Sequence, residues 1–492
     1  MCLSQGALNL NDLSRTLARS LVFFTSAAVL VIEILAARIL APYLGVSLEV
    51  FTGIIGVILA GISIGAWLGG RTADRGEPRS LLGPLLVAGG VAAVASPLIV
   101  DLIGPALSTG PASIVLASVL GFFAPAALLS AVPPIVVKIR LSSLDQTGSV
   151  VGSYSAVGTA GAILGTFLTG FVLIAAFPTR PIVIAVGGAL TLSGAVLWTS
   201  GRSKGPPVLL SFVVLAALVL LFDGPCEYET TYSCAIVEED PANPGGRTLV
   251  LDRVRNSYVD LNDPTHLEFR YVRLIADVIE VEAPQGPLDV VSVGGGGFTL
   301  PGYLRATRPG TANTVLEIDE KLVEIGETEL GLDEDVEVIT EDARTSMERL
   351  SSNRSDVIIG DAFSGASVPW HLTTVEFSEE IRRVLLPDGV YVMNVIDYGE
   401  RDFARSAAAT LQQVFADVAL FAPASYITGS NGGNYILVAS STAIDVTGIE
   451  RAVRSRGSSE IGVTGHALHE FIDGADALTD DFAPVDQIVG RP

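Results

Sequence analysis

Four consecutive glycines and the acids that follow them form the part of the sequence best suited to binding a ligand. The glycines are Gly294, Gly295, Gly296 and Gly297, directly after the apolar run 288–293. Glu317 lies 20 positions after Gly297, at the tip of a second apolar run, and Asp319 follows it. Residues without a Cβ let backbone N–H groups approach a ligand, and an acid at this spacing can accept hydrogen bonds from both ribose hydroxyls. The order predicts a nucleotide-binding βαβ unit.

The kind of nucleotide follows from what the glycine run lacks. It is not the G-x-G-x-x-G pattern of dinucleotide sites, and we expect Pro301 to interrupt the helix start where a pyrophosphate would sit. A nucleoside without a diphosphate, of the S-adenosyl type, is therefore favoured over NAD. The alternative is a plain glycine turn in a parallel sheet.

Further acids follow later apolar runs in the same half of the chain. Strands are predicted at 336–340, 356–361, 390–395 and 434–439, the last of the chain. Asp342, with Ala343 beside it, follows the first of these strands, and Asp361 ends the second. The carboxyl ends of parallel strands share the edge where open α/β sheets bind ligands, so we expect these acids to converge there. Asp342 suits the exocyclic amine of adenine.

Other segments frame this unit. Residues 228–260 predict β-hairpins built on the turn 241–246, and 267–279 has the periodicity of an amphipathic helix leading into the glycine strand. Asp319 is expected to cap a helix that runs to Leu330. His466, His469 and Glu470 have helical spacing without a third ligand, so we predict a surface helix and no metal site.

Composition divides the 492 residues into two halves. Residues 1–223 contain 8 of the 53 acids and 11 of the 30 bases, which leaves 45 acids and 19 bases for 224–492. Apolar runs of spanning length occur at 19–40, 50–70, 81–103, 112–137, 150–177 and 181–199, with a shorter one at 207–222. The first half is therefore predicted to cross a lipid bilayer six or seven times, and the second to be a strongly acidic soluble domain.

Small residues recur inside the predicted spans. The second and fifth spans are rich in glycine, which favours helix packing over a translocation path. These glycines are Gly53, Gly56, Gly61, Gly65, Gly69, Gly152, Gly158, Gly161, Gly165 and Gly170. Glu33 and Arg38, in or at the end of the first span, should pair or line a cavity, with a partner for them expected on another helix.

The basic residues predict an orientation. They gather at the N-terminus and in alternate loops, which places those loops in the cytoplasm. Six spans would then leave the soluble domain inside, and seven would place it outside. S-adenosyl ligands are made in the cytosol, which favours the inside. Cys226 and Cys234, just after the last apolar run, can form a disulfide if their side is oxidising.

The surface chemistry excludes one class of partner. Only Lys138, Lys204 and Lys321 are lysines, and the net charge is −23. An acidic, lysine-poor surface suits molar salt, where the Debye length falls to about 3 Å, so we expect a halophilic source, with arginine-rich codon usage as the alternative. The sequence contains no basic stripe, so nucleic acid is not an expected partner.

Together the motifs carry a resemblance. The order of hairpins, VSVGGGGF, VLEID, EDA, DVIIGDAF and TTVEFSEEIRRVLLPDGV resembles the spermidine synthase family over about 228–440, and the apolar half with the tail 478–486 resembles its membrane-fused branch. The resemblance implies that Gly294 to Gly297 cradle the methionine part of decarboxylated S-adenosylmethionine. It also implies ribose binding by Glu317, adenine binding by Asp342, acid–base catalysis by Asp361 and a substrate contact by Tyr271.

Three departures from the family pattern concern the acceptor. Gly297 stands where the family has an aspartate, Arg273 replaces the glutamate two residues after Tyr271, and Ser364 replaces the second aspartate of the catalytic loop. A diamine needs two anionic partners, each worth about 4 kcal/mol at about 4 Å and an effective dielectric constant near 20. We therefore expect an acceptor other than putrescine.

The expected architecture is a multi-pass α-helical membrane domain (1–223), a β-hairpin subdomain with a linking helix (224–285) and an α/β Rossmann-like domain of the S-adenosylmethionine-methyltransferase type (286–492). We expect an S-adenosyl-dependent transferase acting on an amine or another nucleophile, without a metal, with a homodimer as one arrangement. The alternatives are a methyltransferase, or a non-catalytic nucleoside-sensing module fused to a transporter-like bundle; 70–75 resembles a loop motif of major facilitator transporters.

Overall fold

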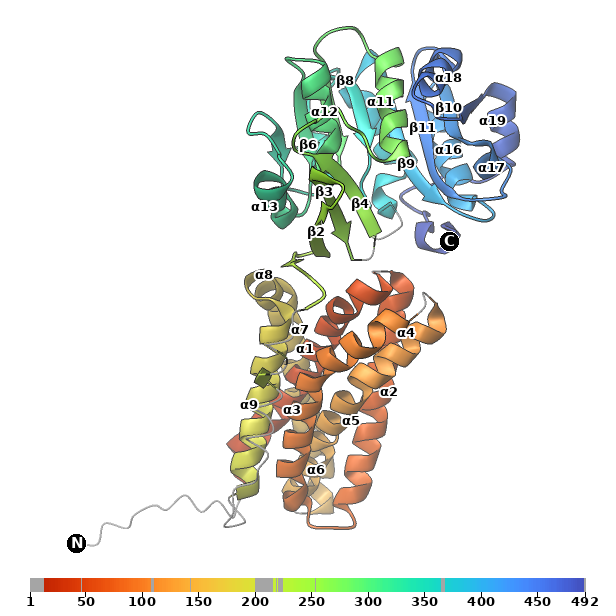
Figure 1. Cartoon of the computed structure of the whole chain (residues 1–492). Helices are drawn as coiled ribbons and strands as arrows, with labels where there is room; N and C mark the ends of the chain where they lie inside the picture. Colours follow the sequence, from red (N-terminus) through yellow and green to blue (C-terminus); the bar gives the residue numbers. More distant parts are fainter. Residues whose placement is uncertain are drawn as a thin grey trace, which may run out of the picture. The chain divides into compact units, whose positions relative to one another are not determined.

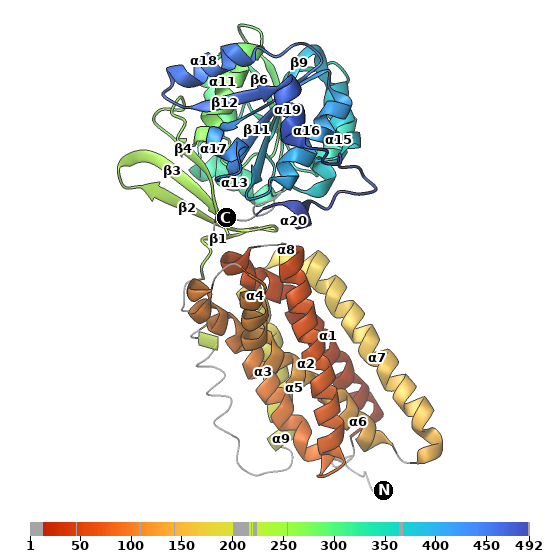
Figure 2. The same ribbon diagram turned by 90° about the vertical axis from the view of Figure 1, so that its right-hand side faces the viewer.

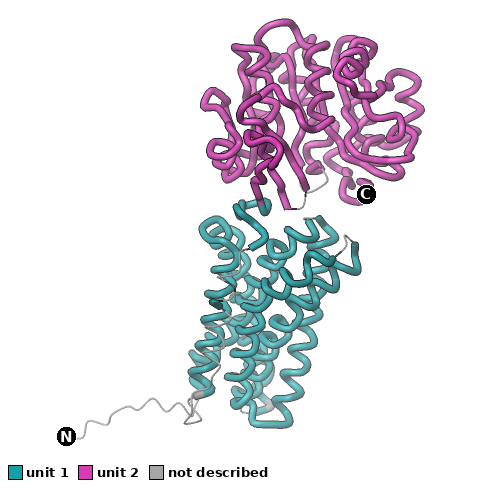
Figure 3. Tube along the Cα trace, viewed as in Figure 1, with its two compact units in different colours: residues 1–234 teal, residues 235–492 magenta. Residues whose placement is uncertain are grey.

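The structure is a computed structural model that divides the chain into two compact units, residues 1–234 and 235–492 (Figure 3). It describes residues 13–45, 47–107, 110–141, 143–199, 216–217, 219, 224–252, 254–363 and 368–490. Residues 224–234 group with the helical unit, although the composition suggested that they begin the soluble half. Each unit has its own hydrophobic core.

The first unit is a helical bundle (Figure 1). Within its described residues, six helical runs are long and apolar enough to cross a membrane, which is the sequence expectation for the first six spans. The predicted seventh run, 207–222, falls almost entirely outside the described residues. The helices are α1 (Arg15–Leu44), α2 (Leu48–Ala73), α3 (Pro78–Ile103), α4 (Pro111–Ser118), α5 (Ala124–Ser130), α6 (Val132–Arg140), α7 (Thr147–Leu168), α8 (Ile174–Ala176) and α9 (Thr179–Thr199).

Glycines bring the helix backbones together, as predicted for several of them. A Cβ added at Gly161 of α7 would lie 2.2 Å from the carbonyl oxygen of Phe23 on α1, and one at Gly65 of α2 would lie 2.1 Å from that of Ala127 on α5. Nothing lies within 4 Å of such an atom at Gly56, Gly152 or Gly170, so these three glycines do not pack helices. Close backbone approach supplies dispersion contacts where lipid offers no hydrophobic drive.

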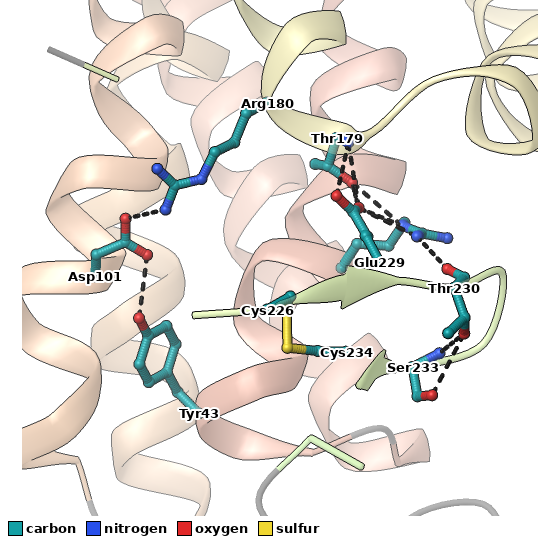
Figure 4. The surroundings of a disulfide bond; sticks show 10 residues. Tyr43, Asp101, Thr179, Arg180, Cys226, Glu229, Thr230, Ser233 and Cys234 are labelled. Carbon is teal, nitrogen blue, oxygen red and sulfur yellow. Dashed lines mark hydrogen bonds and ion pairs between the residues drawn. A yellow bond between two sulfur atoms is a disulfide. The ribbon is translucent and has the colours of Figure 1, made fainter. Parts of the chain in front are cut away.

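Polar contacts tie the segment 224–234 to one end of the bundle (Figure 4). Arg38 of α1 donates to Glu229 (Nη2 to Oε1, 3.1 Å) and to the hydroxyl of Thr179, the first residue of α9 (3.2 Å). The expected partner of Arg38 on another helix is therefore confirmed. Cys226 and Cys234 form a disulfide in the same segment.

The second unit begins with β-hairpins. The strands β2 (Cys234–Asp240), β3 (Asn243–Leu251) and β4 (Val254–Asp260) pair antiparallel, and β2 turns into β3 within the predicted turn. Helix α11 (Arg270–Glu282) follows, as its apolar periodicity predicted. It leads into β5 (Asp289–Val293), the strand before the glycines.

An eight-stranded mixed sheet forms the core of this unit, in the order β12-β10-β11-β9-β8-β5-β6-β7 (Figure 1). The five strands β7, β6, β5, β8 and β9 are parallel neighbours, as expected. Their bounds and those of the other three are β6 (Ala312–Leu316), β7 (Glu337–Ile339), β8 (Ser355–Gly360), β9 (Leu385–Asp397), β10 (Asp417–Pro423), β11 (Gly433–Ser440) and β12 (Glu460–Thr464).

Two strands were missed by the sequence analysis. β10 and β12 add to the sheet antiparallel, so the strand at 434–439 is neither the last of the chain nor at the edge of the sheet. The expectation for Pro301 was also wrong. Helix α12 (Thr299–Thr307) contains it in the first turn, where the missing N–H has no partner inside a helix anyway.

Helices cover both faces of this sheet (Figure 2). On one face, α11, α12 and α18 (Val446–Ser455) share a core with the strands, and on the other α14 (Ala343–Arg349), α15 (Val375–Val384), α16 (Asp402–Val414) and α19 (Gly465–Ile472) do so. The short α17 (Ala424–Ile427) connects β10 to β11, and α20 (Val485–Ile488) lies in the C-terminal tail. Asp319 caps α13 (Glu320–Glu329) as predicted. This three-layer arrangement leaves the carboxyl edge of the sheet for a ligand.

Gly161→Ala tests the helix packing. Alanine favours a helix over glycine by roughly 0.5–1 kcal/mol, but the added methyl group at this position overlaps the backbone of α1, and overpacking costs about 1–3 kcal/mol. We expect a lower melting temperature for the detergent-solubilised protein, measured by intrinsic fluorescence. Gly152→Ala on the same helix is the control, and it should leave the melting temperature unchanged or raise it. Equal melting temperatures for the two variants would contradict the packing.

Candidate active site

A cavity of about 530 Å³ lies at the carboxyl edge of the sheet. All four glycines of the loop after β5 line it, together with Asp361, Tyr271 and residues of β4 and β11. The parallel pairing of β5 with β8 explains the placement, because it brings Gly294 and Asp361 to the same end of neighbouring strands.

The glycine loop needs residues without side chains. Gly294 has φ +96°, and a Cβ there would lie 2.7 Å from the carbonyl oxygen of Asp361. Gly297 lies against Ser257 of β4, 2.3 Å from where its Cβ would be. Phe298, only 4% exposed, packs behind the loop beside Gly295 and Gly326 and does not line the cavity. The pocket side of the loop is therefore bare backbone.

Asp361 is held by two side chains in this cavity. The hydroxyl of Tyr271 donates to Oδ2 at 3.3 Å, and the amide nitrogen of Asn394 donates to Oδ1 at 2.8 Å. Asn394 is 1% exposed, and its own oxygen accepts from Nδ2 of Asn434 at 3.0 Å. These bonds fix the Asn394 amide so that its N–H group points at the carboxylate.

The surroundings of Asp361 set its ionisation. Burial raises the pKa of the carboxyl to about 7, although the bonds from Asn394 and Tyr271 favour the charged form. The pKa of Tyr271 lies well above its ordinary value because burial and the neighbouring carboxylate both disfavour a phenolate. A carboxyl that titrates near neutral pH beside a neutral phenol can accept a proton and return it.

Asn394 and Asn434 were missed by the sequence analysis. Asn394 interrupts the apolar run of β9, and Asn434 stands at the start of β11. A polar amide inside a buried strand needs a partner, so Asn394 did offer a signal. The strand order β11-β9-β8 places the two amides beside Asp361, and this order could not be predicted from the sequence.

Glu317 supports the glycine loop from the neighbouring strand. It is 7% exposed, and it accepts from the backbone N–H of Gly295 (2.8 Å) and of Asp319 (2.9 Å). Burial raises its pKa, partly offset by these N–H groups. Asp319 is buried as the cap of α13. Each carboxylate oxygen of Glu317 keeps a lone pair for a further donor.

Asp342 caps α14 and bonds to a histidine. Its Oδ1 accepts from the backbone of Arg344 and Thr345, and its Oδ2 lies 2.9 Å from Nε2 of His371. Burial opposes ionisation here, but His371 and the two N–H groups outweigh it and lower the pKa. Ala343, the first residue of α14, is buried.

The C-terminal tail stabilises the region around Asp342. Arg344 donates to both oxygens of Asp480, at 2.7 and 2.5 Å, and to the carbonyl oxygen of His371 at 3.0 Å. The tail thus holds the segment that carries His371, which in turn orients Asp342. Asp480 was quoted only as part of a family motif and had no role assigned from sequence.

The structure brings some predicted residues together and separates others. Asp361, Tyr271 and the four glycines share the cavity. Of the described residues, Glu317, Asp319, Asp342 and Ala343 stand on the adjoining strand ends outside its lining. Ser364 lies outside the described residues. In the described ranges, no group of three or more His, Cys, Asp or Glu residues could hold a metal ion; His466 pairs with Glu470 on α19.

Comparison with known proteins identifies a domain. Residues 268–446 match the family model of the spermine/spermidine synthase domain. The match covers the glycine loop, Glu317, Asp342 and Asp361.

Characterised relatives share part of this region. The chain is 30% identical over 165 residues to a polyamine aminopropyltransferase of Vibrio vulnificus, which is 32% of this chain and 53% of that protein. The chain thus spans about half the length of that relative. It is 24% identical over 220 residues to a polyamine aminopropyltransferase of Chromobacterium violaceum. That alignment covers 44% of this chain and 80% of the relative. A probable spermidine synthase from Corynebacterium glutamicum is a structural neighbour, with 31% sequence identity and a TM-score of 0.49. The superposition covers 52% of this chain and 97% of that protein.

Asp361→Asn tests the ionisation of the site. In the folded protein the pKa of Asp361 is raised to about 7, whereas an unfolded aspartate ionises near pH 4. The folded state therefore binds the extra proton, and the contribution of Asp361 to stability falls as the pH rises from about 4 to about 7, by up to about 1.4 kcal/mol per pH unit.

We expect Asp361→Asn to raise the melting temperature over the wild type by roughly 5 °C more at pH 8 than at pH 5. Asn394→Leu should lower wild-type stability most at high pH, because it leaves the ionised carboxylate without its amide donor. A melting-temperature difference that does not change with pH would contradict the raised pKa.

Proposed function

Because the chain belongs to the spermine/spermidine synthase family through residues 268–446, we propose that it transfers an aminopropyl group from decarboxylated S-adenosylmethionine to an amine. The observation that supports this most is the juxtaposition of Asp361, Tyr271 and a bare glycine loop in one cavity. The names of its relatives support the same reaction class.

The reaction follows from this arrangement. The nitrogen of the acceptor attacks the propyl carbon bonded to the sulfonium; the new C–N bond forms as the C–S bond breaks, and the electron pair stays on sulfur to give methylthioadenosine. Asp361 accepts the proton that the ammonium must lose to become a nucleophile. The Tyr271 hydroxyl orients the Asp361 carboxylate. The second proton of the attacking amine is shed to solvent after transfer, or kept on the product at neutral pH.

The donor would lie along the glycine loop. The free lone pairs of Glu317 suit the two ribose hydroxyls, and Asp342, oriented by His371, suits the exocyclic amine of adenine. The remainder of the donor would lie against the four glycines that line the cavity, where the loop has no side chains.

Calorimetry and product analysis on the full-length protein in detergent and high salt test this proposal. Decarboxylated S-adenosylmethionine and methylthioadenosine should both bind, and mass spectrometry should detect an aminopropylated amine. Asp361→Asn should lower kcat by about 10²- to 10⁴-fold with donor affinity kept within a few-fold. Glu317→Gln should weaken donor binding about tenfold or more.

Glu327→Gln, an exposed acid on α13, is the control and should change neither quantity. Absence of heat with both nucleosides would contradict the proposal. Binding without turnover would favour the sensing module, and methyl transfer from S-adenosylmethionine would favour a methyltransferase.

We further propose that the catalytic unit follows an odd number of membrane crossings and lies outside the cytoplasm. Helix α9 starts at Thr179, which Glu229 contacts, and ends at Thr199 a helix length of about 30 Å away. Gly224 lies beside Arg180 at the start of α9, so Thr199 and Gly224 stand at opposite ends of the bundle. The apolar run 207–222 between these two residues has the composition of a crossing segment.

Charge supports the same orientation. The end opposite Glu229 carries Lys138, paired with Asp74, and Arg140, which donates to the Leu13 carbonyl. Basic residues favour the cytoplasmic side. The Cys226–Cys234 disulfide suits an oxidising compartment.

Labelling of intact cells tests the orientation. After mild reduction, an impermeant maleimide should label Cys226 and Cys234 in a Cys2→Ser background, because both lie on the outer side. Ser143→Cys, an exposed position between α6 and α7, is the control with Cys226 and Cys234 replaced by serine, and it should react only after permeabilisation. The reverse pattern would place the unit in the cytoplasm.

A further inference from the structure

A second buried carboxylate lines the cavity at a distance from Asp361. Glu460, the first residue of β12, is 3% exposed and belongs to the cavity wall. Neither of its carboxylate oxygens has a hydrogen-bond partner among the described residues. Its neighbouring cation is Arg270 of α11, whose Nε lies 3.5 Å from Oε1.

That ion pair leaves Glu460 incompletely satisfied. A separation of 3.5 Å exceeds the 2.7–2.9 Å of charge-assisted N–H···O bonds, and the Arg270 side chain is 53% exposed. A buried carboxylate without hydrogen bonds is costly, and native proteins rarely keep one without a reason. A ligand with N–H donors and a positive charge would supply what the site lacks.

The sheet order separates Glu460 from Asp361. β12 is four strands from β8, with β10, β11 and β9 between them. Strands lie about 4.8 Å apart, so the two strands are roughly 19 Å apart in a flat sheet, and twist shortens the distance between their ends. Asn434 of β11 and Pro423 of β10 line the cavity between the two acids, so the cavity connects them.

This separation selects a length of ligand. A four-carbon diamine has five bonds between its nitrogens and reaches about 6 Å at the extended-chain rise of about 1.2 Å per bond. A triamine with three- and four-carbon arms reaches about 11 Å, and a tetraamine about 16 Å, by the same rule. A hydrogen bond of about 2.8 Å at each end extends these spans to about 17 Å and about 22 Å, which bracket the roughly 19 Å between the strands, whereas the diamine spans only about 12 Å. A short diamine held at Asp361 cannot also contact Glu460.

We propose that Glu460 binds the far ammonium of the acceptor, and that the acceptor is a linear polyamine with three or more nitrogens. The proposal rests on the proposed aminopropyl transfer and specifies its substrate. The reacting nitrogen lies at Asp361, the chain passes Asn434, and the distal ammonium donates to the free oxygens of Glu460. Arg270 turns toward solvent, where most of its side chain already lies.

Charge at the cavity explains why a second acid is needed. Arg255, Arg270 and Arg273 line the same wall and repel a polycation. Arg273 donates to the Leu267 carbonyl and Arg255 stacks over Phe269, so both are held by protein groups. Glu268 also lines the cavity, but it is exposed and lies beside His266. Glu460 is the buried acid that offsets Arg270, and it would supply the second anionic partner that Ser364 and Arg273 removed from the family pattern.

Acceptor binding tests this directly, independently of turnover. Calorimetry with the full-length protein saturated with methylthioadenosine would measure the affinity of a four-carbon diamine, a triamine and a tetraamine. We expect the longer amines to bind at least tenfold more tightly than the diamine. Glu460→Gln should weaken triamine and tetraamine binding about 10- to 100-fold, the factor for a lost hydrogen bond to a charged group, and leave diamine binding unchanged.

A second variant is expected to strengthen triamine binding. Arg270→Ala removes the cation that competes for Glu460 and should tighten triamine binding several-fold; its exposed position makes misfolding a minor concern. Glu470→Gln, an exposed acid on α19, is the control and should leave all affinities unchanged.

The outcomes separate this proposal from the one it rests on. Binding of methylthioadenosine together with equal affinities for all amines, or no effect of Glu460→Gln, would overturn the role of Glu460 and leave the transferase intact. Tighter binding of an amine that carries a carboxylate would overturn it in favour of recognition by the arginines. Failure of methylthioadenosine to bind would overturn both.

Discussion

The parallel pairing of β5 with β8 is the constraint on which the site depends. The N–H of Asp361 donates to the carbonyl of Val293 at 2.9 Å, which fixes the end of β8 against the end of β5. The backbone after Asp361 then passes so close to Gly294 that no side chain fits there. The glycine turn and the Asp361 carboxyl therefore lie side by side because of one backbone register, before any side-chain contact is considered.

Side chains from the antiparallel part of the sheet then tune this corner. Burial alone would keep Asp361 protonated, and the amide chain from Asn434 through Asn394 returns part of the lost solvation. The result is a carboxyl that can hold or release a proton near neutral pH. The same added strands carry Glu460 to the far end of the cavity. The strands beyond β9 thus extend the cavity as well as completing the sheet.

The helical unit obeys a different rule. Its six long helical runs are apolar enough to cross a membrane, and their closest contacts depend on glycines that let carbonyl oxygens of a neighbouring helix approach. At one end of the bundle, Arg38 and Thr179 bond to Glu229 of the segment that leads to the second unit. Under the proposed orientation, an S-adenosyl donor made in the cytosol would have to cross the membrane to reach the second unit.

The sequence by itself determined the two classes of architecture, six helical runs long and apolar enough to cross a membrane, the glycine turn and the acids at strand tips. These features depend on the local hydrophobic period and on residues without a Cβ. The sequence also indicated the family. It could not assign β10 and β12, whose short apolar runs resemble any buried segment, or reveal that Asn394, Asn434 and Glu460 face one cavity. Strand order decides which distant residues become neighbours, and strand order is set by packing of the whole sheet. For the same reason, only the tertiary structure showed that His371 and the tail residue Asp480 support Asp342.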